Sequence, residues 1–184
     1  SLQTFANYLI DHTIPPVFMI HLHLLIFQLI QQESPPEINQ AILSIIISTY
    51  DKFIKSDDNE DGYVDYEALV GYIMSFIPSE EAFEALALIT SQYLDAAKIV
   101  VKEIDAILEW INDEELIHNA LILINALVRH EEIVSDLNPY INNFLVLSQN
   151  LDSDNLKVIY SILGCYTQTK QGLTSIEDYE MLGS

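Results

Sequence analysis

One acidic segment, residues 57–68, carries oxygen-bearing side chains at the spacing that calcium chemistry uses. Calcium takes six to eight oxygen ligands, and a twelve-residue loop supplies them from alternate positions around a glycine that makes the sharp turn. Gly62 stands at the sixth position of the segment. The candidate ligands at positions 1, 3, 5 and 9 are Asp57, Asn59, Asp61 and Asp65.

The same segment departs from a complete EF-hand at the position that matters most. The twelfth position requires a bidentate glutamate, and Ala68 stands there instead. Glu67 comes one residue early, which rotates its side chain by about 100° on the emerging helix. We therefore expect weak calcium affinity or none, and no cofactor. Two hypotheses remain: a calcium-responsive helical protein with a degenerate EF-hand-like loop at 57–68, or a solvated acidic insertion at 57–65.

No other group of residues indicates catalysis. Cys165 lies in an apolar run without a histidine near it in sequence, which favours a buried thiol over a nucleophile. His21 and His23 are two residues apart, so a helix places them on nearly opposite sides and they do not share a metal. The sequence contains no glycine-rich phosphate loop, no zinc spacing and no Ser/His/Asp arrangement in a recognisable context. We expect a protein that is not an enzyme.

The charge of the chain limits its partners. Seven basic residues face 28 acidic ones in 184 residues, for a formal net charge of −21. Such a surface repels nucleic acids and anionic lipids and attracts basic partners within about 10 Å at ordinary ionic strength. The alternative is that the charge only keeps an apolar chain soluble. The most apolar run, 17–30, is shorter than the ~18 residues that span a bilayer, so we expect no membrane insertion.

Apolar residues recur at helical spacing through most of the chain. Prolines and acidic residues mark the breaks between the runs, and Ser79, Asp113 and Asp152 are predicted N-caps. The predicted helices span 2–11, 16–32, 37–56, 64–77, 80–94, 96–111, 114–130, 131–150 and 153–169.

The helices also recur in pairs. Residues 72–81 align with residues 106–115 at an offset of 34, and later copies follow at similar steps. A period of this length, made of two antiparallel helices, predicts an all-α fold, an α-α superhelix (HEAT/armadillo-like solenoid) of about four and a half pairs. Residues 1–184 then form a single helical-repeat domain. The alternative is an irregular bundle of helices with similar lengths.

Polar residues follow one face of the second helix of each pair. In the predicted helix 96–111, polar side chains recur at intervals of three or four, opposite a face predicted to be buried. This polar stripe contains Lys98, Lys102, Asp105, Glu109 and Asn112, and Ser135, Asn138, Asn142 and Gln149 occupy similar places in the next second helix. A solvated helix face with no partner is the alternative for each of them.

The residues resemble HEAT repeats, and among these the karyopherin-β (importin) family of nuclear transport receptors. The resemblance is carried by 137–145, with its Pro139, followed by the Asp/Ser/Asn turn at 151–158 and by 162–164. It covers residues 78–169 and extends loosely over the first half. The resemblance implies a protein-protein interaction module that binds a basic protein segment on an inner surface lined by second helices.

The resemblance also implies where such a segment binds. Asp105, Glu109 and Asn142 are the implied contacts on the second helices. In the acidic insertion, Asp58, Glu60 and Asp61 are implied contacts as well. A full receptor has far more repeats, so we expect a receptor fragment or a smaller scaffold or adaptor, in the cytoplasm, the nucleus or both.

Overall fold

The computed structural model describes residues 2–12, 18–32, 35–52 and 64–168, and every regular element in these ranges is a helix. The predicted all-helical class is confirmed. The α-helices are α1 Leu2–Asp11, α2 Met19–Ile30, α3 Pro36–Lys52, α4 Tyr66–Met74, α5 Glu80–Gln92, α6 Leu94–Val100, α7 Ile104–Leu108, α8 Ile117–Leu127, α9 Glu131–Leu137, α10 Ile141–Leu147 and α11 Ser153–Thr167. Short 3₁₀ segments are η3 Val101–Glu103, η4 Glu109–Asn112 and η5 Asn138–Tyr140.

The three predicted N-caps accept backbone hydrogen bonds. The Ser79 hydroxyl accepts from the Ala82 amide at 3.2 Å, and Asp152 Oδ1 accepts from two amides at 2.9 and 3.1 Å. Asp113 Oδ1 accepts from two amides at 2.9 and 3.0 Å. The first amides of a helix have no carbonyl partner one turn earlier in the helix, and each cap supplies an acceptor for them. Asp113 caps a turn rather than a helix, because α8 begins only at Ile117.

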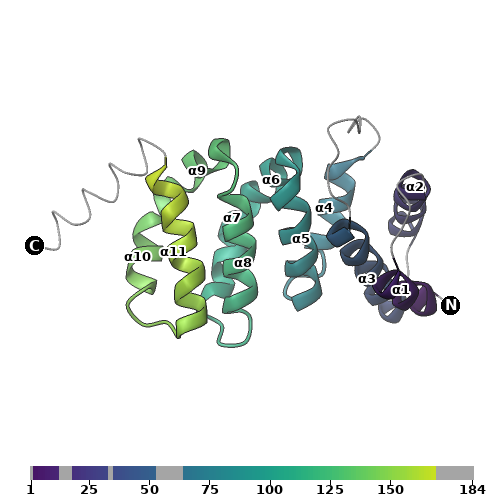
Figure 1. Ribbon diagram of the computed structural model, residues 1–184, viewed down its shortest axis with the longest axis horizontal. Helices are drawn as coiled ribbons and strands as arrows, with labels where there is room; N and C mark the ends of the chain where they lie inside the picture. Colours follow the sequence, from purple (N-terminus) through teal and green to yellow (C-terminus); the bar gives the residue numbers. More distant parts are fainter. Residues whose placement is uncertain (1, 13–17, 33–34, 53–63, 169–184) are drawn as a thin grey trace, which may run out of the picture.

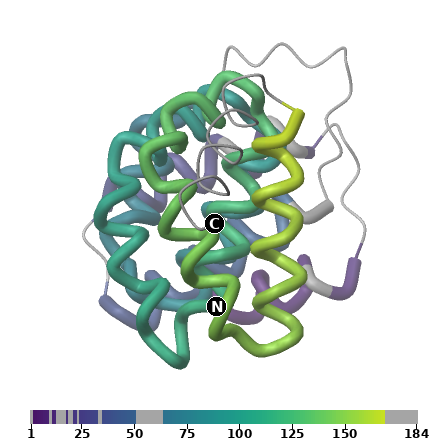
Figure 2. Tube along the Cα trace, turned by 90° about the vertical axis from the view of Figure 1, so that its left-hand side faces the viewer, coloured from purple at the N-terminus to yellow at the C-terminus, as the bar shows by residue number. Residues whose placement is uncertain are grey.

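The helices pack in two rows that follow the order of the chain. The first row contains α1, α3, α5, α8 and α11, and each contacts the next. The second row contains α2, α4, the segment from α6 to η4, and the segment from α9 to α10, with contacts from α2 to α4, α4 to α6 and η3 to α9. Both rows follow the long axis, with α1 and α11 towards opposite ends (Figure 1). Figure 2 views the molecule from the end where α11, in yellow, lies.

The second-row segments are less regular than the predicted helices 96–111 and 131–150. Each is interrupted by 3₁₀ turns, at η3 and η4 in one segment and at η5 in the other. Pro139 lies within η5 and explains that break, since proline lacks the amide hydrogen and its ring clashes with the preceding turn of an α-helix. Nothing in the structure explains the break at η3.

One hydrophobic core connects both rows. In the first row, Phe83 and Leu86 of α5 and Leu121 and Ile124 of α8 are fully buried. Burying a side chain of this size stabilises the folded state by about 1.5–3 kcal/mol before the entropic cost of ordering it. Because consecutive first-row helices contact one another, neighbouring pairs stabilise one another.

Hydrogen bonds also connect consecutive first-row helices at two similar places. Gln92 Nε2 donates to the carbonyl oxygen of Tyr50 at 2.9 Å, and His130 Nε2 donates to the carbonyl oxygen of Thr90 at 2.5 Å. Both carbonyls lie in the last described turn of their helices. A side chain near the end of one first-row helix thus binds the end of the previous one, in two successive pairs.

Candidate functional site

Six residues were predicted to contact a basic segment, and the structure describes the three of them that lie in the second row. Asp105 is on α7, Glu109 on η4 and Asn142 on α10, and each side chain is exposed. Lys98, Lys102 and Asn112 of the predicted polar stripe are exposed too.

Asp105 also joins two successive second-row segments. Its Oδ1 accepts a hydrogen bond from the Tyr140 hydroxyl at 2.7 Å, and this bond raises the pKa of Tyr140. Lys98 Nζ and Glu132 Oε2, 2.8 Å apart, connect the same two segments. Asp105 Oδ2 accepts no hydrogen bond from the described residues, which leaves that oxygen for a cationic partner.

The structure describes only one of the candidate calcium ligands. Asp57, Asp58, Asn59, Glu60 and Asp61 lie outside the described residues. Asp65 is the N-cap of α4, where its Oδ1 accepts from the Ala68 amide at 3.0 Å. Across 2–12, 18–32, 35–52 and 64–168, no group of three or more His, Cys, Asp or Glu side chains could hold a metal ion.

Asn138 departs from the predicted stripe. Its side chain is half-buried, and both of its amide atoms are buried without a hydrogen-bond partner in the described part of the chain. Its position next to Pro139 in η5 takes it out of the regular helical periodicity on which the stripe was predicted.

A chain of three side chains joins α8 to α11. Asn155 Nδ2 donates to Asp152 Oδ2 at 2.6 Å. The side-chain oxygen of Asn155, Oδ1, lies 2.9 Å from His118 Nδ1. An amide oxygen only accepts, which identifies His118 Nδ1 as the donor. The pKa of Asp152 is lowered, first by the backbone hydrogen bond from Asn155. The arrangement positions α11 against α8.

An acidic pocket of about 210 Å³ lies beside these three hydrogen-bonded side chains, where the turn before α8 meets the turn before α11. Asp113, Glu114 and Asp152 contribute carboxylates, and Asn112, Asn150 and Asn155 contribute amides. Asp113 and Asp152 already cap their turns through one oxygen, whereas Glu114 is exposed. Carboxylates and amide oxygens around a hollow of this size suit a lysine or arginine side chain.

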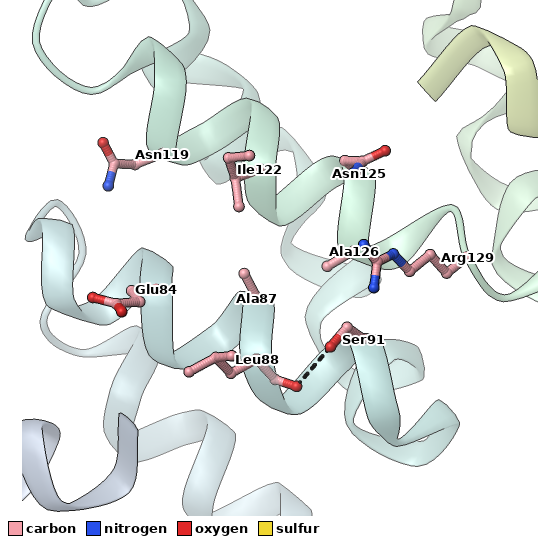
Figure 3. A pocket seen from close by; sticks show the side chains of 9 residues that line it. All are labelled: Glu84, Ala87, Leu88, Ser91, Asn119, Ile122, Asn125, Ala126 and Arg129. Carbon is pink, nitrogen blue, oxygen red and sulfur yellow. Dashed lines mark hydrogen bonds between the residues drawn. The ribbon is translucent and has the colours of Figure 1, made fainter. Parts of the chain in front are cut away.

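A larger pocket of about 300 Å³ lies between α5 and α8. Its walls include Leu88 and Ser91 of α5 and Asn119 and Ile122 of α8, with Arg129 at one end (Figure 3). The sequence interpretation missed this site because its residues come from two helices and match no motif. The one available signal was that Arg129 is the only arginine in the chain.

Cys165 of α11 is half-buried, and burial raises the pKa of its thiol more than the nearby Arg129 lowers it. A thiol with a raised pKa is a poor nucleophile at neutral pH.

No protein-family model, no curated protein and no solved structure matches this chain. Among the described helices, none has the length and apolar character needed to cross a membrane.

Proposed function

We propose that this chain is a HEAT-type interaction module, an α-α superhelix of about four and a half helix pairs that binds a basic segment of a partner protein. The contacts between successive first-row helices, α1 to α3 to α5 to α8 to α11, support the superhelix. The observation that carries the binding proposal is the net charge of −21, together with the exposed Asp105, Glu109 and Asn142 in the second row.

The physical basis is electrostatic. Cationic groups are attracted to the acidic surface over roughly a Debye length, and charge-assisted hydrogen bonds to carboxylates then fix the segment in place. Asp105 and Glu109 are four residues apart on consecutive turns, so a chain lying across them meets both carboxylates. The acidic pocket at the turns offers a further place for one basic side chain.

The biological setting is proposed from the resemblance alone. Within it, the module acts as a scaffold or adaptor, or as part of a nuclear transport receptor, in the cytoplasm or the nucleus. The proposal assigns no catalytic residue, because the side chains that meet in the second row hold a partner and do not activate a nucleophile.

The experiment uses the whole chain and a fluorescein-labelled peptide that contains four consecutive lysines. Fluorescence anisotropy gives the affinity of the wild type and of the double variant Asp105→Asn/Glu109→Gln. We expect the double variant to bind at least fivefold more weakly at low salt, and binding by the wild type to weaken steeply as salt rises.

A matched control separates a site from diffuse attraction. The double variant Asp11→Asn/Glu37→Gln removes the same charge from exposed residues of the first row. It is expected to keep its affinity within twofold of the wild type. Equal losses in both double variants, or binding that ignores salt, would contradict the proposal. Circular dichroism confirms that every variant remains helical.

A further inference from the structure

The single arginine of the chain has no counterion in the described structure. Arg129 makes no ion pair with any described residue, although acidic side chains outnumber basic ones fourfold. Lys98 and Lys157, in contrast, are paired with Glu132 and Asp154 at 2.8 Å. A guanidinium presents five donors in a planar fork that suits a carboxylate. Arg129 is thus an exposed positive charge on a molecule whose net charge is strongly negative.

Arg129 lies at the end of the α5–α8 pocket. Figure 3 shows its guanidinium turned back towards Ala126 and Ser91, across the opening between the two helices. A cation two residues after the end of α8 is also favoured by the helix dipole. That interaction depends on charge alone, however, and does not require the guanidinium to point into the pocket.

Apolar side chains form the middle of the pocket, and Ser91, Asn119 and Asn125 also line it. Leu88 is half-buried and Ile122 is 37% exposed, and the small side chains of Ala87 and Ala126 leave the space between them. Glu84 stands at the far end from Arg129 (Figure 3). A complementary ligand therefore has one negative group near Arg129, an aliphatic part in the middle and no second negative group at the Glu84 end.

The dimensions indicate what arrangement of side chains fits. Ile122 and Ala126 are four residues apart on α8, which is about 6 Å along the helix axis, and the guanidinium of Arg129 is turned towards Ala126 (Figure 3). Side chains on the same face of an extended peptide, at positions i and i+2, are about 7 Å apart. An acidic residue with an aliphatic residue two positions away therefore places its carboxylate at Arg129 and its aliphatic group between Leu88 and Ile122.

We propose that the α5–α8 pocket is a docking site for an extended segment of a partner protein that carries an aspartate or glutamate two residues from an aliphatic side chain. The unpaired guanidinium at the end of a pocket with an aliphatic middle carries this inference. The site is distinct from the second-row surface proposed above for a basic segment, and it does not depend on that proposal. A partner that has both segments would bind the first row through its acidic segment and the second row through its basic segment.

The experiment exploits the fact that one arginine gives one Nε–Hε resonance. The ¹⁵N-labelled whole chain is titrated with the peptide acetyl-Ser-Leu-Ser-Glu-Ser-Leu-Ser-amide, and the arginine resonance is followed together with the backbone amides of α5 and α8. We expect saturable shifts of these resonances, and at least tenfold weaker binding of the peptide in which glutamine replaces glutamate.

Three variants extend the test. Arg129→Gln should weaken binding of the glutamate peptide at least tenfold, measured on the backbone amides. Lys102→Gln changes the net charge equally at an exposed second-row residue and should leave the affinity within twofold. Ile122→Ser should weaken binding at least threefold while keeping the peptide's preference for glutamate over glutamine.

Four outcomes would overturn the proposal. The glutamate and glutamine peptides could bind alike, or Lys102→Gln could cost as much as Arg129→Gln. Acetate at the same concentration could also shift the arginine resonance as far as the peptide does, which would reduce the site to a simple anion contact. Absence of any saturable shift at millimolar peptide would count against it equally.

Discussion

Removing one hydroxyl between the two rows should measurably destabilise the fold. Tyr166 of α11 is fully buried, and its hydroxyl donates to the carbonyl oxygen of Leu137 at the end of α9, 2.8 Å away. Burial raises the pKa of Tyr166, so the phenol remains a protonated donor at neutral and moderately alkaline pH. The substitution Tyr166→Phe deletes this bond and keeps the ring in its packed position.

The expected magnitude follows from the kind of bond. Deleting a buried donor leaves the Leu137 carbonyl without this partner, which costs about 1–2 kcal/mol of the free energy of unfolding. For a domain of this size, each kcal/mol corresponds to about 2–4 °C in Tm, so Tm should fall by about 2–8 °C. Ring packing contributes little to the difference, because phenylalanine preserves the contact with Phe144, 6.5 Å away between ring centroids.

The assay is thermal and urea unfolding of the whole chain, followed by circular dichroism at the helical band. The matched control is Tyr160→Phe, which removes the same atom from the same helix at a residue that is 60% exposed. The control should melt with the wild type. If Tyr166→Phe has the same Tm as the wild type, or if both variants lower Tm equally, the hydrogen bond between α11 and the second row does not stabilise the fold.

Three further outcomes are expected. Asp152→Ala should lower Tm at neutral pH, and Asp154→Ala should not. The pKa of Asp152 is lowered in the folded state, so its contribution to the free energy of unfolding is present above its unfolded pKa of about 3.9 and is lost as pH falls through the folded value. The difference in Tm between the wild type and Asp152→Ala should therefore disappear in acid. A difference that persists in acid would contradict the capping role. Lys98→Met should leave Tm unchanged, because the salt bridge to Glu132 is exposed and screened by solvent. A clear fall in Tm would show that this salt bridge does stabilise the fold. Millimolar calcium should leave Tm unchanged, because Ala68 supplies no carboxylate; a calcium-dependent rise in Tm would restore the calcium hypothesis.

Local signals predicted most of the helices. The expected helix 2–11 coincides with α1, and the expected start of α5 at Glu80 and of α11 at Ser153 are confirmed. These predictions rested on the period of apolar residues and on a cap followed by acidic residues, both of which act within one or two turns of the chain. Where local rules compete, the prediction was less accurate: the helix expected from 114 begins at Ile117, because the Asp113 side chain stabilises a turn first.

The candidate sites were predictable only in part. The exposure of Asp105, Glu109 and Asn142 followed from helical periodicity, since each lies opposite an apolar face. The half-burial of Asn138 did not follow, because the 3₁₀ turn at Pro139 alters which face that residue occupies.

The sequence by itself determined the sign of the net charge, the all-helical class and the starts of several helices, because each depends on composition or on residues within a few positions of one another. The tertiary structure alone decided that Tyr140 binds Asp105, that His130 binds the end of α5, and that Arg129 faces a pocket between α5 and α8. These contacts join residues about 35 to 40 positions apart, and only the packing of one helix pair against the next brings them together.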